Sequence, residues 1–422
     1  MKLRLFFSLI ILGIILSCSD DDESTAPIVV VAPDDTEEEE ENQNPPVADG
    51  RLVCENGFAG VFPCDDFDLM AQIDLSQFGN SSGGNDIWGW TDPVTNTEYA
   101  LFGQREGTSF IDISTPTEPR IVGFLPSETS SSQWRDIKVY NEYAFIVSEA
   151  SEHGMQVFDL SLLRDIASGE NITFTPSAVY TEFGNAHNIV INEQQAFAYV
   201  VGTSTFSGGP HIVDISNPLN PTFAGGFSGE GYTHDAQVVT YNGPDADYTG
   251  REIYIGSNED EVVIIDVTDK TNIFQIAEVN YPNIGYTHQG WLTKDQDYFI
   301  ANDELDESNV GFNTRTLLFD FTDLDNPTFS GTFTGDSAAI DHNLYVKGNE
   351  VFLSNYTRGI RVADISDIAT GNLFDTGSFD TFPSNNNTSF NGVWSIYPYF
   401  DSNNIIVSDI DGGLFILRRT GT

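Results

Sequence analysis

The chain has 422 residues, of which 40% are hydrophobic and 12% aromatic, enough for one large β domain or two to three smaller domains. It carries 17 Lys and Arg against 64 Asp and Glu, a formal net charge of −47. Such a surface repels phosphate backbones, which argues against nucleic acid as a partner and favours the attraction of cations.

The first 18 residues are typical of a targeting segment. The basic start MKLR precedes the apolar run LFFSLIILGIILS, which is short for a membrane span. The sequence Ile15-Leu16-Ser17-Cys18 resembles a bacterial lipobox, in which the cysteine thiol is acylated and becomes the mature N-terminus. We therefore expect residues 1–18 to be a lipoprotein signal peptide with lipidation at Cys18, the alternative being an ordinary signal peptide.

The acidic run SDDDE follows this cysteine directly, and it is similar to the surface-export signal of lipoproteins in some Gram-negative lineages. We expect an outer-membrane lipoprotein displayed on the cell surface, held to the membrane only by its lipid. Residues 19–50 are acidic and Pro-rich, with too few apolar groups to fold, and predict a disordered tether.

Residues 51–80 contain the remaining cysteines, Cys54 and Cys64, in VCENGFAGVFPC. In an exported protein these two predict a disulfide that closes a short loop, and a metal site made of two thiolates is the alternative. The segment 68–78, DLMAQIDLSQF, has the length and alternation of a β-strand.

Residues 81–422 are repetitive. A short apolar run that ends in Asp and a turn recurs every 44 to 55 residues, as in SFIDIS, HIVDIS, VIIDVT and RVADIS. A period of this size, built from short β-type runs, predicts a β-propeller with four strands in each blade. The first strands of seven units are centred near Ile87, Ile137, Ile189, Ala236, Trp291, Leu344 and Trp394.

The seventh unit ends after its third strand, GLFILRR, and lacks the Asp of the other units. A closed ring cannot leave that edge unpaired without inviting aggregation. We therefore predict an all-β, seven-bladed propeller whose ring is closed by the N-terminal strand in the last blade.

Four of the six histidines share one position, immediately before a first strand, in four consecutive units: His187, His234, His288 and His342. The same position holds Asn85 or Asp86 in the first unit, Arg135 in the second and Asn391 in the seventh. Because first strands line the channel of a propeller, we expect these side chains to gather near its axis.

A second set of polar residues follows the second strand of each unit and should lie at the same end of the channel. Its members are Gln104, Glu149, Thr203, Asn258, Asp303, Asn355 and Asp409. Imidazole binds transition metals well, and nearby carboxylates can orient the rings. The pattern therefore indicates a candidate transition-metal site, with His187, His234, His288 and His342 as ligands.

Two other interpretations of the histidines remain open. Recurring residues of a repeat can be structural, as in WD repeats, where a His before the first strand hydrogen-bonds within its own blade. The histidines could also contact a ligand directly, without metal. The acidic loops 258–261, 302–308 and 408–413 are weaker candidates for calcium, since none has EF-hand spacing. We expect His153 and His211 to be surface or turn residues.

The chain from Cys54 to Leu417 resembles the choice-of-anchor B family, which is built from LVIVD-type repeats. The motifs that carry the resemblance are WGWTDP (88–93), GTSFIDIS (107–114), WRDIKVY (134–140), HGMQVFDL (153–160), AHNIVINE (186–193), NDELDE (302–307), DHNLYV (341–346) and VWSIYPYF (393–400). The resemblance implies an exported, repeat-built propeller and no established activity.

Two functions are therefore expected to compete. The first is a surface-anchored binding module, a monomer that contacts an extracellular ligand or protein through one face of the ring. The alternative is a metal-dependent oxidoreductase or hydrolase with histidine ligands near the axis and Glu149 or Asp303 as base or as a group that orients a ligand. Convergence of the imidazoles is the feature that separates a shared site from independent structural roles.

Overall fold

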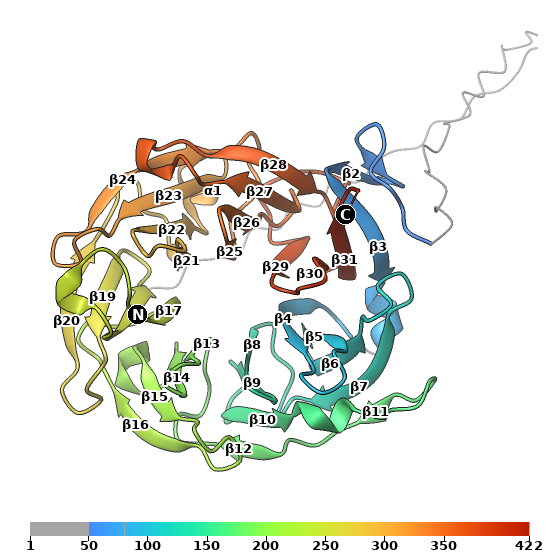
Figure 1. Ribbon diagram of the computed structural model, residues 1–422, viewed down its shortest axis with the longest axis horizontal. Helices are drawn as coiled ribbons and strands as arrows, with labels where there is room; N and C mark the ends of the chain where they lie inside the picture. Colours follow the sequence, from blue (N-terminus) through green and yellow to red (C-terminus); the bar gives the residue numbers. More distant parts are fainter. Residues whose placement is uncertain (1–49, 80, 422) are drawn as a thin grey trace, which may run out of the picture. The chain divides into compact units, whose positions relative to one another are not determined.

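The computed structural model describes residues 50–79 and 81–421. The expected lipidation at Cys18 and the expected tether, apart from its last residue, lie outside the described residues. Seven antiparallel sheets are arranged around a central channel, as Figure 1 shows in a view along the axis. The predicted seven-bladed propeller with four-stranded blades is confirmed.

Each blade runs from an inner strand at the channel to an outer strand at the rim. The inner strands are β4 (Gly84–Thr91), β8 (Arg135–Tyr140), β13 (Asn188–Asn192), β17 (Asp235–Thr240), β21 (Thr287–Leu292), β25 (Leu344–Lys347) and β29 (Val393–Tyr397). The second strands are β5 (Glu98–Gln104), β9 (Tyr143–Ser148), β14 (Phe197–Val201), β18 (Glu252–Ser257), β22 (Tyr298–Asp303), β26 (Glu350–Ser354) and β30 (Ile405–Asp409).

The third strands are β6 (Gly107–Asp112), β10 (Met155–Asp159), β15 (His211–Asp214), β19 (Val262–Asp266), β23 (Arg315–Asp320), β27 (Ile360–Asp364) and β31 (Gly413–Arg419). The outer strands are β7 (Arg120–Pro126), β12 (Ala178–Tyr180), β16 (Thr222–Gly226), β20 (Phe274–Val279), β24 (Thr328–Thr334), β28 (Phe374–Phe379) and β3 (Phe67–Ile73). Three short strands extend the edges: β1 (Phe58–Ala59), β2 (Phe62–Asp65) and β11 (Ile172–Thr173). The helical turns are η1 (Leu75–Phe78), η2 (Leu160–Leu163), η3 (Phe206–Gly208), η4 (Ala246–Tyr248), α1 (Asp306–Asn309) and η5 (Ile368–Thr370).

The ring closes as predicted, because β3 pairs antiparallel with β31 in the last blade. The strand is shorter than the segment 68–78 suggested, and its end is marked by Asp74, which caps η1. The preceding hairpin of β1 and β2 adds to the outer edge of the sixth blade, where β2 pairs with β28. Residues 51–73 therefore belong to two blades of the propeller and are not a separate element.

The Asp that ends six of the third strands has a structural role. In each case its side chain accepts a hydrogen bond from the backbone N–H two residues further on, at 2.7–3.0 Å. This is the Asx turn that Asp forms where a strand must reverse. The turn therefore accounts for the recurring Asp, which gives no evidence of a functional site.

The core lies between neighbouring blades. Seven clusters of buried side chains each join residues of two adjacent sheets, such as Val157 with Val200 and Ile264 with Phe319. Side chains at the channel add polar links between blades. Asp136 accepts from the backbone N–H of Ile189 at 2.8 Å. These contacts hold the inner strands at constant spacing, which positions the residues at their ends.

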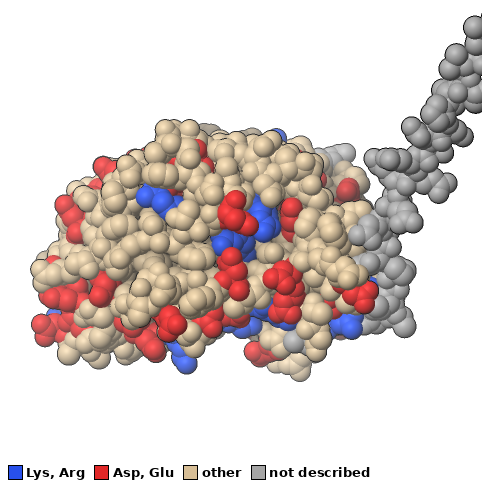
Figure 2. All heavy atoms as spheres, turned by 90° about the horizontal axis from the view of Figure 1, so that it is seen from above, with Lys and Arg blue, Asp and Glu red and all other residues tan. Residues whose placement is uncertain are grey.

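The surface carries the charge excess of the sequence. Figure 2 shows Asp and Glu side chains spread over the rim of the propeller, with fewer Lys and Arg among them. Within residues 50–79 and 81–421, no helix has the length and apolar character needed to cross a membrane.

Candidate metal centre

The four recurring histidines converge at one end of the channel. They lie at or just before the start of β13, β17, β21 and β25, and neighbouring rings are in contact. The ring centroids are 4.1 Å apart for His187 and His234, 4.2 Å for His234 and His288, and 4.5 Å for His288 and His342. Three of the four are buried, with His187 partly exposed at the end of the row.

The backbone explains why these positions are equivalent. The N–H groups of His187, His234 and His342 donate to carbonyls of the neighbouring second strand at 2.9–3.0 Å. In the fifth blade a β-bulge between Thr287 and Gln289 leaves His288 unpaired in the ladder. Bulges of this kind redirect a side chain. Each of these four inner strands therefore presents one imidazole to the channel.

Hydrogen bonds fix which ring nitrogen carries the proton in three of the histidines. Nδ1 of His234 donates to the carbonyl of His288 at 3.1 Å, and Nδ1 of His342 donates to the carbonyl of Trp394. Nδ1 of His187 donates to the Glu149 carboxylate at 2.6 Å. A carbonyl or carboxylate only accepts, so the proton is on Nδ1 and the Nε2 lone pair is free. Metal-binding imidazoles in proteins are held in this way.

These bonds connect different blades. His234 contacts the fifth blade, His342 the seventh and His187 the second. The structural role that the sequence left open, a hydrogen bond within the histidine's own blade, is not the arrangement found at these three residues.

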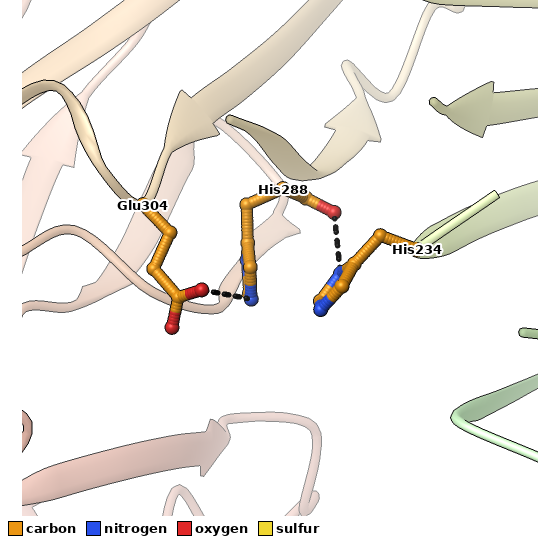
Figure 3. Close-up of side chains that lie close together, drawn as sticks. All are labelled: His234, His288 and Glu304. Atoms are coloured by element: carbon orange, nitrogen blue, oxygen red, sulfur yellow. Dashed lines mark hydrogen bonds and ion pairs between the residues drawn. The ribbon is translucent and has the colours of Figure 1, made fainter. Parts of the chain in front are cut away.

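Glu304 completes the cluster and was not anticipated as a site residue. Its carboxylate lies 3.8 Å from Nε2 of His288 and 3.7 Å from Nε2 of His342, and it accepts a hydrogen bond from the Tyr356 hydroxyl at 2.8 Å. Figure 3 shows His234, His288 and Glu304 directed toward a common point. One ligand atom from each of these three lies within 4.8 Å of the other two. They form the candidate metal site.

The only sequence signal for Glu304 was the acidic stretch NDELDES. Counting from the second strand selected its neighbour Asp303, which ends β22. Glu304 is the next residue, and it is the one whose carboxylate reaches the histidines.

The electrostatics of the cluster disfavour protons on the rings. Burial, together with repulsion by neighbouring histidines, lowers the pKa values of His234 and His288 well below the usual range. Burial lowers the pKa of His342 to about 3 and raises the pKa of Glu304 to about 7. The rings of His234, His288 and His342 are therefore neutral near pH 7, with lone pairs available, and the buried carboxyl has no full positive charge beside it. A divalent cation bound here would supply that charge.

The remaining blades depart from histidine at this position. In the first blade Asn85 donates to the carbonyl of Gln133 at 3.1 Å. Arg135 lines the same small cavity as the four histidines, and its guanidinium bonds to the carbonyl of Gln104 at 3.1 Å and contacts His153 at 3.3 Å. In the seventh blade the position is occupied by Trp394, whose ring centroid is 4.8 Å from that of His342.

The expectation for Asn391 in the seventh blade is therefore wrong. Asn391 lies two residues before β29 and donates to Asp411 at 3.1 Å. A bulge between Val393 and Ser395 makes Trp394 the residue that faces the channel mouth.

Of the seven polar residues after the second strands, all of them within the described part of the chain, Glu149 alone bonds to a clustered histidine, His187. Asp303 accepts from the backbone N–H groups of Gly285 and Tyr286 at 2.6 and 2.7 Å. Asp409 accepts from Asp411 and Gly412, also through backbone N–H groups. Both carboxylates hold loops in place.

Three further members of that set are also engaged locally. Asn258 bonds to the Thr233 hydroxyl at 2.7 Å, and Asn355 donates to Asp341. The amide of Gln104 lies 2.5 Å from the hydroxyl of Ser109. These residues shape the turns at the channel mouth and leave little capacity for a ligand.

His153 and His211 are buried, contrary to the expectation of surface positions. His153 is 0% exposed and His211 is 2% exposed. Nδ1 of His153 contacts the Gly154 carbonyl at 3.0 Å, while His211 bonds to the hydroxyls of Tyr180 and Thr205 at 2.8 and 2.9 Å. His211 thereby links the third blade to Tyr180 of the second, and neither histidine belongs to the four-histidine cluster.

The paired cysteines form the expected disulfide between Cys54 and Cys64. Two more groups of acidic side chains converge among the described residues: Glu230 with Glu261 and Glu278, and Asp245 with Asp323 and Asp325. Each contains at least one exposed residue, and exposed acidic groups are common without a bound ion. These two acidic groups therefore add no structural support for bound calcium.

The opposite end of the channel is different in character. Lys138 lies 2.8 Å from Asp136 and 3.6 Å from Asp86, so the charges inside the channel are paired. Beyond them, aromatic residues including Trp88 and Trp291 line a cavity of about 350 Å³. This end has no histidine, and the candidate metal ligands all lie at the other mouth.

Comparisons with known proteins support the repeat and the fold. Residues 183–228, which span the third blade, match the LVIVD repeat family. A protein of known structure from Lactobacillus plantarum is similar, with 13% identity over 77% of this chain and 89% of that chain and a TM-score of 0.52.

A second solved structure, a functionally unknown protein from Desulfotomaculum acetoxidans, has 13% identity over 67% of this chain and 83% of its own, with a TM-score of 0.46. No curated protein matches the chain significantly. The chain thus contains an LVIVD repeat within a seven-bladed propeller.

Proposed function

We propose that the protein is a binding module whose working face is the histidine-bearing mouth of the channel, and that this face holds a divalent transition-metal ion. The observation that carries the proposal is the convergence of His234, His288 and Glu304 within 4.8 Å, with Nδ1 of His234 already directed to a backbone carbonyl. His187 and His342 flank this set and extend the row of imidazoles.

The ligand types favour a transition metal over calcium. Two imidazoles and one carboxylate suit zinc, iron, copper or nickel, whereas calcium takes six to eight oxygen ligands. The burial of His288 and His342 also opposes protonation, which competes with metal binding. A metal ion at the mouth would act as the anchoring point for an extracellular ligand.

A metal-dependent oxidoreductase or hydrolase is the second candidate, and one observation favours it. Three converging protein ligands leave coordination positions open, which is typical of catalytic sites, whereas structural zinc sites are closed by four. Two histidines and a carboxylate also resemble the ligand set of non-haem iron oxygenases. In this reading Glu149, bonded to His187 at 2.6 Å, is placed to accept a proton near the mouth.

The experiment is elemental analysis of protein purified without a metal-affinity column, for the wild type and for His234→Ala, His288→Ala and the double variant. We expect close to one equivalent of a transition metal in the wild type and a sharp loss in either single variant. The double variant should lose little more, because the site is already broken. The identity of the metal separates the candidates, since iron indicates redox chemistry and zinc indicates binding or hydrolysis.

A metal-free wild type, with stability losses that add across the two single variants, would reject the site. The histidines would then be structural groups, each replacement costing about 1–3 kcal/mol for a lost buried hydrogen bond.

We further propose that the module is held at the cell surface by lipid on Cys18. The support is the lipobox-like Ile15-Leu16-Ser17-Cys18 and the acidic run that follows it. Because acylation needs the thiol, Cys18→Ser should move the protein from the membrane fraction to the soluble fraction. Unchanged fractionation, or an unacylated mature N-terminus in the wild type, would contradict this anchoring. Protease accessibility on intact cells tests surface display.

A further inference from the structure

The cluster of histidines occupies only part of the channel mouth. Beside it lies a cavity of about 430 Å³, here called the mouth pocket. Its lining residues are Arg105, Gln133, Trp134, Glu304, Tyr356, Phe390, Trp394 and Ile410. Glu304 belongs both to this pocket and to the candidate metal site, so a molecule in the pocket lies next to the metal position.

Arg105 is the polar feature of the mouth pocket that the fold does not explain. Its side chain has no hydrogen bond or ion pair with any described residue, and its Nε atom is buried without a partner. The other described arginines each bond to an acidic side chain, an amide or a carbonyl group, as Arg358 does with Asp336. Arg105 is therefore the one described arginine whose side chain makes no bond to the protein.

Gln133 adds a second unsatisfied group, because its side-chain carbonyl is buried without a hydrogen-bond partner. The Arg105 guanidinium is a group that proteins use to recognise a carboxylate, since it matches the two carboxylate oxygens. The Gln133 carbonyl only accepts, so it does not pair with the carboxylate. The guanidinium at the wall of the cavity is therefore available to a ligand.

The rest of the mouth pocket is aromatic. Trp134 and Phe390 are 45% and 51% exposed, which is high for side chains of this size, while Tyr356 and Trp394 are buried behind them. Pockets that bind small organic molecules combine apolar and aromatic walls with a few polar groups that set orientation. The aromatic walls therefore favour a ligand in which a flat or apolar part is attached to the group that pairs with Arg105.

We propose that the mouth pocket binds a small organic carboxylate with an aromatic body, whose carboxylate pairs with Arg105 while its body packs against Trp134 and Phe390. The ligand thereby lies against Glu304, at the open side of the metal ion. This inference names the ligand class of the site proposed above and rests on that proposal for the metal.

The test uses three probes and isothermal titration calorimetry on the zinc-loaded protein. Phenylacetate carries both the charge and the ring, acetate carries only the charge, and benzyl alcohol carries only the ring. We expect phenylacetate to bind more tightly than either of the others. Arg105→Gln should weaken phenylacetate binding about tenfold or more and leave the zinc content unchanged.

Arg358→Gln is the matched control. It removes a partly exposed guanidinium after the second strand of the sixth blade and changes the net charge by the same amount, but Arg358 does not line the mouth pocket. Phenylacetate affinity should be unchanged in this variant. Equal weakening in both variants would show a general charge effect and overturn the assignment to Arg105.

The outcomes for the metal and for the pocket are distinguishable. A zinc-loaded protein that does not bind phenylacetate, or binds it equally well as Arg105→Gln, overturns the mouth pocket and leaves the metal site standing. A protein that takes up no metal but binds phenylacetate through Arg105 supports the pocket and rejects the metal site. In cobalt-loaded protein, phenylacetate should also change the visible spectrum, and an unchanged spectrum would contradict contact with the metal.

Discussion

Glu304→Gln is the most discriminating single change, because Glu304 was not among the ligands expected from the sequence and is the only carboxylate of the proposed set His234, His288 and Glu304. The substitution keeps the size of the side chain and keeps an oxygen that accepts from the Tyr356 hydroxyl. It removes the negatively charged carboxylate that would coordinate a metal ion. We therefore expect the metal-free variant to be about as stable as the metal-free wild type.

The magnitude follows from ligand linkage. A metal held at 100 times its Kd stabilises the folded state by about 2.7 kcal/mol. With an unfolding entropy of about 2.1 cal/mol/K per residue, a propeller of about 370 residues shifts its Tm by about 1.3 °C per kcal/mol. The wild type should therefore melt about 3–4 °C higher with metal than with chelator. If Glu304→Gln weakens the metal affinity about a hundredfold, the stabilisation by metal at the same concentration falls to about 0.4 kcal/mol. The corresponding rise in Tm is about 0.5 °C.

The assay is differential scanning calorimetry with zinc and with chelator, on the wild type, Glu304→Gln and Glu230→Gln. The last is a control, since Glu230 belongs to a separate acidic group with Glu261 and Glu278. Its metal-dependent shift should equal that of the wild type. An equal shift in the wild type and Glu304→Gln would refute the reasoning, and loss of the shift in Glu230→Gln alone would place the ion in the acidic group.

Three further predictions concern the scaffold. Deleting residues 51–80 removes β3, the partner of β31, and should abolish cooperative unfolding at the parent temperature; a truncated protein with an unchanged Tm would show that β3 does not close the ring. Replacing Cys54 and Cys64 by Ser opens a loop of sequence separation 10 and should lower the free energy of unfolding by up to about 3 kcal/mol in urea titrations, whereas an unchanged midpoint would show that the loop is held by packing alone. Burial lowers the pKa values of His153 and His211 to about 4, so unfolded chains bind protons between pH 6.5 and 4 that the folded protein does not. The free energy of unfolding should therefore fall as the pH drops through that interval, by up to about 3 kcal/mol per histidine. It should fall less in His211→Gln than in the wild type, and equal decreases would show that buried His211 does not cause the acid destabilisation.

Local patterns in the sequence were sufficient for the architecture. The period of 44 to 55 residues, the strand-sized apolar runs and the missing last strand depend on neighbours along the chain, and they predicted seven blades and closure by the N-terminal strand. The shared position of His187, His234, His288 and His342 followed from the same repeat, since equivalent residues of successive blades lie side by side around the axis.

What the tertiary structure alone decided is the direction of side chains where the repeat is irregular. A bulge between Val393 and Ser395 places Trp394 at the mouth, where Asn391 was expected. In the fifth blade the residue that reaches the histidines is Glu304, one position after the expected Asp303. Local side-chain bonds decide the rest: Arg135 contacts His153, Asp303 and Asp409 accept from backbone N–H groups of nearby loops, and Arg105 has no side-chain hydrogen bond or ion pair with another described residue. A repeat pattern cannot report such contacts, because it gives only the backbone positions that the blades share, whereas these bonds depend on side chains and turns that differ from one blade to the next.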